Sequence, residues 1–178
     1  MDTDVDLRAY IRSIPDFPRP GIVFRDITPL LLSPKALDKA VRDLADYGRS
    51  RGGIDYVVAA EARGFILGAA LARELGAGFV PARKPGKLPS ETISAEYVLE
   101  YGVDALEMHR DAFAGGANVL IHDDLLATGG TARALCDLVE QLGGHVRGCG
   151  FLVELTFLGG RERLHPFDVR ALVSYESE

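Results

Sequence analysis

Two adjacent acids followed by a glycine-rich loop are the residues of this sequence best suited to chemistry. Asp123 and Asp124 end an apolar run that begins at Asn118, and the loop after them consists of Ala127, Thr128, Gly129, Gly130 and Thr131. Such a loop at the start of a helix offers backbone N–H groups and hydroxyls to a phosphate dianion. The carboxylates would repel a phosphate, but they suit ribose hydroxyls and a divalent cation. The pattern therefore predicts a site for a ribose 5-phosphate.

The same segment has a plainer explanation, which is a strand-to-helix turn with an Asp cap and glycines that allow tight geometry. The apolar strand and the paired acids before the loop favour the binding site over that turn. Two other phosphate motifs are excluded, because the sequence has neither the Gly-Lys-Ser/Thr end of a nucleotide-triphosphate P-loop nor a Gly-x-Gly-x-x-Gly fingerprint.

A cluster of basic residues offers a site for a second anion. Arg83, Lys84 and Lys87 follow an apolar segment in a chain whose formal net charge is −6. In an acidic protein such a cluster favours an anion site over a solvated basic loop. Pro85 and Gly86 suit an exposed turn between these cations.

Alternating helix and strand patterns must position these residues. A short amphipathic helix is expected over 5–14, and Ser33 is expected to cap a second helix that opens with Pro34. Further helices are expected over 65–75 and 131–142, and strands over 54–60, 77–81, 118–123, 146–155 and 169–175. This order predicts an α/β fold with three layers and a mostly parallel central sheet. Such folds bind ligands at the carboxyl ends of their strands, where the acids and the basic cluster stand.

Length and composition bound the class of protein. With 178 residues, 47% of them hydrophobic and 26% charged, the chain suits a single globular domain. The acidic balance argues against nucleic acid as a partner, and no apolar run is long enough to cross a membrane. The N-terminus lacks a signal-peptide pattern and the two cysteines lack a pairing pattern, so we expect a cytoplasmic protein. The histidines share no ligand spacing, so no metal held directly by the protein is expected.

The segment 123–131 resembles the phosphoribosyl pyrophosphate signature of the type I phosphoribosyltransferases, and its Leu-Leu-Ala-Thr-Gly-Gly-Thr form is similar to that of the adenine-specific members. Other segments resemble the family in the family's order: 14–27 its base-binding hood, 61–65 its pyrophosphate loop, and 83–89 and 96–102 the segments that flank and form its mobile catalytic loop. The resemblance implies one domain over 1–178, with the hood over approximately 1–32 and the mobile loop over approximately 88–103. His122 departs from the family's small aliphatic residue, and we expect a neutral, satisfied histidine there.

The resemblance also implies an activity. The family's adenine enzymes transfer the 5-phosphoribosyl group from phosphoribosyl pyrophosphate to adenine, giving AMP and pyrophosphate, with Mg²⁺ held mainly by the substrate. A homodimer is implied as well, in which Arg83 acts in its own site or in that of its partner. Two alternatives are a transferase for another base, such as xanthine or orotate, and a non-catalytic regulator that senses phosphoribosyl pyrophosphate. The hood argues against the first, and the lack of a basic extra segment argues against the second.

Each site residue receives a role from the same resemblance. Asp123, Asp124 and the loop over 127–131 would bind the ribose and its phosphate. The pyrophosphate would be bound by Arg63, Arg83, Lys84 and Lys87. Phe24 and Leu125 would cover the two faces of adenine, while the backbone around Val23 and Arg25 reads its 6-amino edge. Glu100 would be the acid/base that handles the proton of the purine.

Overall fold

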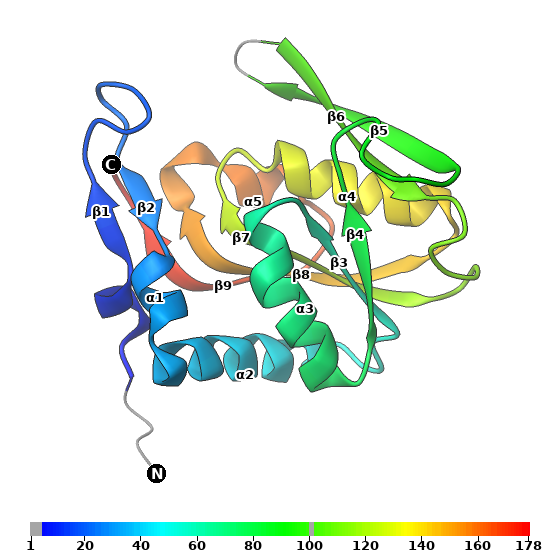
Figure 1. Ribbon diagram of the computed structural model, residues 1–178, viewed down its shortest axis with the longest axis horizontal. Helices are drawn as coiled ribbons and strands as arrows, with labels where there is room; N and C mark the ends of the chain where they lie inside the picture. The colour runs from blue at the N-terminus through cyan, green and yellow to red at the C-terminus, as the bar shows by residue number, and fades with distance from the viewer. Residues whose placement is uncertain (1–4, 100–101) are drawn as a thin grey trace.

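The computed structural model describes residues 5–99 and 102–178, and a parallel five-stranded sheet forms its centre. The strands are β3 (Tyr56–Ala60), β4 (Gly78–Ala82), β7 (Asn118–Leu126), β8 (His145–Leu155) and β9 (Val169–Tyr175). They lie in the order β4-β3-β7-β8-β9, and each is parallel to its neighbours (Figure 1). Because β3, β4 and β7 are adjacent, their carboxyl ends meet at one edge of the sheet.

Helices cover both faces of this sheet and complete the three layers expected from the sequence. α2 (Pro34–Ser50) and α3 (Arg63–Leu75) lie on one face, and α4 (Gly130–Gln141) lies on the other (Figure 1). Ser33 caps α2 by accepting a hydrogen bond from the Ala36 N–H at 3.4 Å, as expected. Gly76 ends α3 with a φ of 67°, a left-handed conformation that glycine adopts readily.

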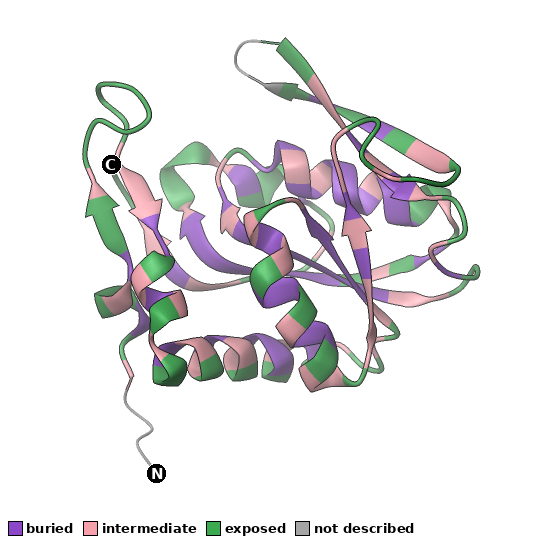
Figure 2. Cartoon of the chain, viewed as in Figure 1, coloured by how far each residue is buried: buried purple, intermediate pink, exposed green. Residues whose placement is uncertain are grey.

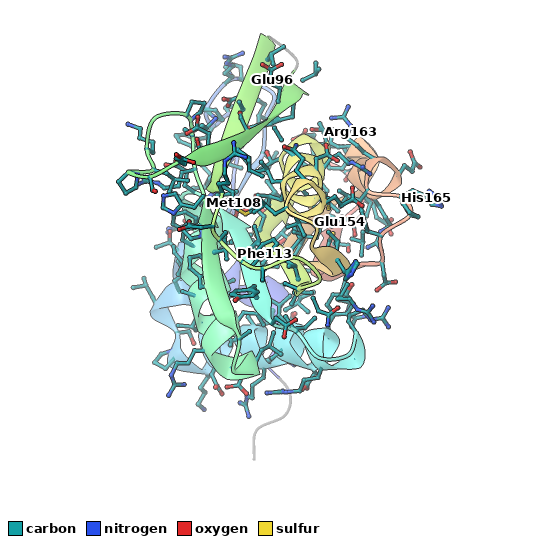
Figure 3. All side chains as sticks on the ribbon, turned by 90° about the vertical axis from the view of Figure 1, so that its right-hand side faces the viewer. Glu96, Met108, Phe113, Glu154, Arg163 and His165 are labelled. Atoms are coloured by element: carbon teal, nitrogen blue, oxygen red, sulfur yellow. The ribbon has the colours of Figure 1, made fainter. Side chains whose placement is uncertain are left out.

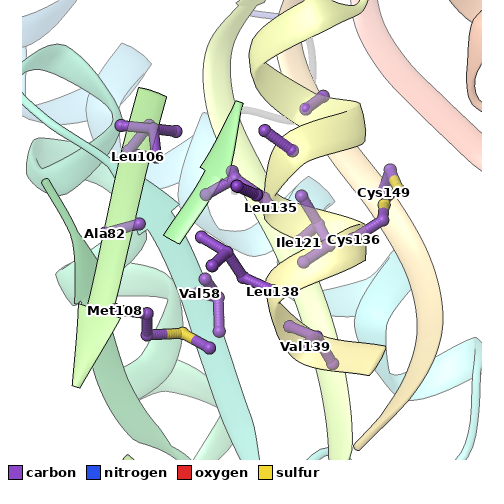
Figure 4. Packing of buried hydrophobic residues seen from close by; sticks show 14 of the residues in the cluster. Val58, Ala82, Leu106, Met108, Ile121, Leu135, Cys136, Leu138, Val139 and Cys149 are labelled. Carbon is purple, nitrogen blue, oxygen red and sulfur yellow. Dashed lines mark hydrogen bonds between the residues drawn. The ribbon is translucent and has the colours of Figure 1, made fainter. Parts of the chain in front are cut away.

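The apolar side of α4 packs into the largest cluster of buried residues in the described part of the chain. Leu135, Leu138 and Val139 are fully buried in one cluster with Val58 of β3 and Ile121 of β7 (Figure 4). β3, β7 and β8 are buried over most of their length (Figure 2), as strands covered on both faces must be. This packing therefore holds α4, whose first two residues belong to the glycine-rich loop, in a fixed position.

The prediction of an N-terminal helix over 5–14 is wrong. A short 3₁₀ helix, η1 (Leu7–Tyr10), is followed by β1 (Arg12–Ile14), which pairs antiparallel with β2 (Phe24–Asp26). Arg12 Nη2 lies 2.7 Å from Asp26 Oδ2, so an ion pair between the two strands holds this segment extended. Tertiary pairing overrides the local helical pattern here. The hairpin leads into a short helix, α1 (Thr28–Leu32).

Two further strands form a ribbon that extends from the body of the molecule. β5 (Thr92–Leu99) and β6 (Gly102–His109) pair antiparallel, and Figure 1 shows them projecting beyond α4. Tyr97 and Leu106 of this ribbon are buried in the same core cluster as α4. Glu100 lies outside the described residues. No helix in the described part of the chain is long and apolar enough to span a bilayer.

A turn after β8 completes the fold beside the glycine-rich loop. It consists of a 3₁₀ turn, η2 (Thr156–Leu158), and a one-turn helix, α5 (Gly160–Arg163). Arg163 of α5 and Glu96 of the ribbon, both labelled in Figure 3, are among the residues that line a hollow of about 280 Å³.

Candidate active site

A cavity of about 190 Å³ opens at the carboxyl end of β7. Its walls are Arg63, at the start of α3, and the continuous run 123–132, which contains both acids, Leu125 and the whole glycine-rich loop. The structure therefore brings together the residues that the sequence assigns to ribose and phosphate. Of the four cations that the sequence assigns to pyrophosphate, Arg63 also lines this cavity.

The loop presents the N-terminal end of α4 to this cavity. Gly129 has a φ of 82° and occupies the N-cap position, and Gly130 is the first helical residue. The first N–H groups of a helix have no partner within the helix, and they carry its positive dipole end. Thr128 is exposed and Thr131 is half-buried, so hydroxyls flank these N–H groups. The arrangement suits a phosphate dianion.

The two acids differ in their surroundings. Asp124 is only 4% exposed, and its carboxylate pairs with Arg63, whose Nε lies 3.1 Å from Asp124 Oδ2. Asp123 Oδ1 accepts a hydrogen bond from the Asp124 N–H at 2.9 Å. Burial raises the pKa of Asp123 well above its usual value, and the charge of Asp124 adds to this effect. Burial also raises the pKa of Asp124, although Arg63 opposes the rise. Ribose hydroxyls that donate hydrogen bonds would favour the ionised form of both.

Arg63 links the acids to the predicted base slot. Its guanidinium carbon lies 5.0 Å from the centre of the Phe24 ring, within the range of a cation–π contact. Phe24 is half-buried at the start of β2, with Phe17 edge-on to it at 5.1 Å between ring centres. The half-buried Leu125 belongs to the cavity wall. One guanidinium thus contacts both the Phe24 ring and Asp124, an acid predicted to bind the ribose.

The end of the described chain fastens the segment around Phe24. The Val23 N–H donates to Glu178 Oε2 at 2.9 Å, and Arg25 Nη2 donates to the Ser177 carbonyl oxygen at 3.2 Å. The Arg25 guanidinium also lies 3.9 Å from the centre of the Tyr175 ring. Figure 1 shows the C-terminal end of the chain beside β2. The backbone predicted to read the base is therefore positioned from β9.

The remaining cations lie beside the cavity and do not line it. Arg83 and Lys84 follow β4, where Glu61 Oε1 accepts a hydrogen bond from the Lys84 N–H at 2.6 Å and lies 3.4 Å from Arg83 Nε. The Lys84 ammonium forms an ion pair with Asp104 of β6, which directs it toward the ribbon. Lys87 is exposed. The structure thus places Arg83 and Lys84 next to Glu61, and none of the three cations lines the cavity.

Two acids that organise these cations were missed by the sequence analysis. Glu61 stands in the same motif as Arg63, and an acid beside a basic cluster could have indicated its role. Asp104 gives no comparable signal, because its contact with Lys84 depends on how the ribbon returns over β4.

His122, the departure from the family pattern, is fully buried beneath the acids. Its Nδ1 lies 2.9 Å from the Gly150 carbonyl oxygen, which requires a proton on that nitrogen. Burial lowers its pKa to about 4, so the ring is neutral, as expected. It is only half satisfied, because Nε2 has no hydrogen-bond partner among the described residues.

Comparisons with known proteins agree with this geometry. A model of the phosphoribosyl transferase domain matches residues 30–163. The adenine phosphoribosyltransferase of Gloeobacter violaceus is 58% identical over 173 residues, which cover 96% of this chain and all of that protein. The crystal structure of the Thermoanaerobacter pseudethanolicus adenine phosphoribosyltransferase has a TM-score of 0.92 at 54% identity, covering 95% of this chain and 98% of the other.

A third relative shows what such a site can hold. The adenine phosphoribosyltransferase of Saccharomyces cerevisiae, complexed with adenine and an imino-altritol bisphosphate, has a TM-score of 0.88 at 41% identity over 93% of this chain and 96% of its own. The mostly parallel five-stranded sheet and these relatives define a type I phosphoribosyltransferase, as expected. The chain belongs to this family and, within it, to the adenine phosphoribosyltransferases.

Proposed function

We propose that this chain transfers the 5-phosphoribosyl group of phosphoribosyl pyrophosphate to adenine, giving AMP and pyrophosphate. The observation that carries the proposal is the cavity formed by Arg63 and residues 123–132. It combines an anion site at the start of α4 with two carboxylates suited to the ribose hydroxyls. Leu125 in its wall and Phe24 beyond Arg63 would cover the two faces of the base. The crystal structure of the yeast relative in complex with an imino-altritol bisphosphate and adenine supports this pair of ligands.

The cavity would act chiefly through positioning and electrostatics. Positive charge develops on the ribose as the pyrophosphate leaves, and the carboxylates of Asp123 and Asp124 would stabilise it. Arg63 would stay with the leaving pyrophosphate, and Arg83, Lys84 and Lys87 would join it there. Glu100, outside the described residues, would move the proton of the purine.

Mg²⁺ fits this site as an ion that the substrate brings. Asp123 and Asp124 are oxygen donors of the kind that Mg²⁺ prefers, and the cation tolerates few protein ligands when phosphate oxygens and water complete its shell. Among the described residues no group of three or more His, Cys, Asp or Glu side chains is placed to hold a metal. When bound, the ion would neutralise the charge of the pyrophosphate.

The proposal includes a homodimer in the cytoplasm. Arg83, one-third exposed and held by Glu61 at the rim, is the residue proposed to reach a partner's pyrophosphate. The cytoplasm is proposed because Cys136 and Cys149 are free thiols, with 3.8 Å between their sulfur atoms.

A coupled assay of nucleotide formation across five nucleobases tests the function. We expect turnover of adenine with Mg²⁺, and turnover of hypoxanthine or guanine lower by about two orders of magnitude. A buried backbone group left unmatched by the wrong base costs ~1–3 kcal/mol, and two such mismatches account for this ratio. Comparable rates with hypoxanthine would contradict the specificity, and no rate with any base would favour the non-catalytic regulator.

A further inference from the structure

The turn after β8 packs backbone against backbone on the glycine-rich loop. Gly160 is buried at the start of α5, and a Cβ placed on it would collide with the Ala127 carbonyl oxygen and lie 2.9 Å from Leu126 Cδ1. A Cβ on Gly129 would in turn lie 2.6 Å from the Gly160 carbonyl oxygen. Real Cβ atoms do not approach other atoms this closely. The contact is therefore reciprocal, and neither glycine has room for a side chain.

An ion pair at the end of β8 fixes the position of Gly160. Arg161, the next residue, donates from Nε to Glu154 Oε1 at 3.1 Å, and Glu154 is only 3% exposed (Figure 3). Glu154 lies directly beside Leu126 in the pairing of β8 with β7. Arg161 Nη1 also donates to the Val169 carbonyl oxygen at 2.7 Å, on β9. Arg161 thus ties α5 to Glu154, beside the strand residue that precedes the loop, and to Val169, the first residue of β9.

This arrangement matters because the loop binds through its backbone. Several N–H groups must point at one phosphate at the same time, and a displacement of a few tenths of an ångström weakens them together. Sites of this kind depend on a supporting layer that holds the binding groups in place. One side of the loop lines the cavity, and Gly160 packs against its other side.

We propose that Gly160, held by the ion pair of Arg161 with Glu154, is a positioning residue for the phosphate loop. It fixes the backbone of residues 127–129 in the conformation that receives the 5-phosphate of phosphoribosyl pyrophosphate. The inference rests on the proposed function of that loop. It assigns a role in substrate affinity to the α5 turn, which does not itself line the cavity.

The variant Gly160→Ala tests this role. We expect its dissociation constant for phosphoribosyl pyrophosphate, measured by calorimetry, to rise roughly 10- to 100-fold, the scale on which small misplacements act. The KM for adenine at saturating phosphoribosyl pyrophosphate should stay within about twofold, because the base slot is built from other residues. Gly115→Ala is the matched control, since its Cβ would have no atom within 4 Å. That variant should bind like the wild type.

A second variant decides the question if Gly160→Ala does not fold. Glu154→Gln keeps an acceptor for Arg161 but removes the charge of the pair, and we expect a smaller rise in the same dissociation constant, roughly three- to tenfold. Unchanged affinity in folded Gly160→Ala, or in Glu154→Gln where the first variant fails to fold, would overturn the inference. So would a lower apparent kcat with both KM values and the dissociation constant unchanged, because that pattern indicates only less folded protein.

The calorimetry separates this inference from the proposed function. Wild-type protein that binds phosphoribosyl pyrophosphate without forming a nucleotide would contradict the proposed function. The dissociation constants of the wild type and of Gly160→Ala would still decide the role of Gly160. Wild-type protein that does not bind phosphoribosyl pyrophosphate would overturn both.

Discussion

Arg63 Nε lies 3.1 Å from Asp124 Oδ2, so the cation assigned to the pyrophosphate is paired with an acid assigned to the ribose. The same guanidinium lies over the ring of Phe24. If the predicted roles hold, a pyrophosphate would give Arg63 a stronger partner, and Asp124 would then be released to accept hydrogen bonds from ribose hydroxyls. We therefore expect substrate binding and the exposure of the Phe24 ring to be coupled through the Arg63 side chain.

Replacing Arg63 should therefore weaken substrate binding and shift its pH dependence. Arg63→Met keeps much of the aliphatic stem, and we expect affinity for phosphoribosyl pyrophosphate to fall about 10- to 100-fold, corresponding to ~1.5–3 kcal/mol for charged hydrogen bonds. Arg63 lowers the pKa of Asp124, so without it the rise of affinity with pH should move to higher pH. Calorimetry between pH 5 and pH 8 measures both effects. Arg73→Met, an exposed position on the same helix, is the control, and a variant of Arg63 that matched it would contradict the coupling.

Asp123→Asn should lose substrate affinity without losing stability. The pKa of Asp123 is raised in the folded protein, so the folded state binds the proton more tightly than the unfolded state. This contribution to stability is present at low pH and is lost as the pH rises through the folded pKa. The asparagine amide does not titrate, so it does not lose this contribution. The free energy of unfolding of the variant, measured with urea, should therefore rise relative to that of the wild type from pH 5 to pH 8. A variant that was strongly destabilised yet bound substrate normally would make Asp123 a structural residue.

His122 should give the protein a measurable acid sensitivity. Burial lowers its pKa from 6.5 to about 4, so the unfolded state takes up a proton more readily than the folded state. The contribution of His122 to the free energy of unfolding is fully present above the pKa of the unfolded state, and it is lost as the pH falls toward 4. We expect the wild type to lose about 3 kcal/mol more than His122→Val between pH 7 and pH 4. Equal losses in urea unfolding of the two proteins would show that the ring protonates without cost.

Glu100→Gln should reduce turnover and leave substrate affinity nearly unchanged, because the loss falls on proton transfer. General acid–base catalysis contributes ~10²–10⁴-fold, which sets the size of the expected fall in kcat. Glu96→Gln, an exposed acid on β5, is the control for charge near the site. Turnover close to that of the wild type in Glu100→Gln would assign the proton to solvent or to another group.

Mixing two inactive variants tests whether Arg83 serves a partner's site. Subunits with Arg83→Ala and subunits with Asp124→Asn are combined by mild denaturation and refolding, and mixed dimers are counted. If Arg83 acts across the interface, each mixed dimer has one site with both wild-type groups. Random pairing makes about half of the dimers mixed, so roughly a quarter of wild-type activity should return. No recovery in a sample that contains mixed dimers would place Arg83 in its own subunit's site.

The sequence predicted the parts of the site whose information is local. Asp123 and Asp124 lie near the end of β7, and Gly129 adopts the positive φ that glycine tolerates just before α4, so all three belong to one continuous strand, loop and helix start. The parallel sheet followed from short apolar runs that alternate with helical patterns. Ser33 and Gly76 marked helix ends for the same reason, since caps are decided by one or two residues.

What could not be predicted depends on residues far apart in the chain. The spacing of Arg83 and Lys84 indicates an anion site, but their pairing with Glu61 and Asp104 follows from the order of β3 and β4 and from the return of the ribbon. The segment over 5–14 has a helical pattern, yet Asp26 holds part of it as a strand. The contact of Gly160 with the loop leaves no local trace, because a glycine in a turn has many possible reasons.

The bond between Val23 and Glu178 joins residues 155 positions apart, and this has a consequence for synthesis on the ribosome. The β1–β2 hairpin emerges early, but its fastening to Tyr175, Ser177 and Glu178 must wait until the whole of β9 has left the exit tunnel. A nascent chain stopped after α4 already contains the loop predicted to bind phosphate, but it lacks the residues that hold Val23 and Arg25 in place. The segment predicted to read the base therefore cannot be fastened until residues 175–178 have been made.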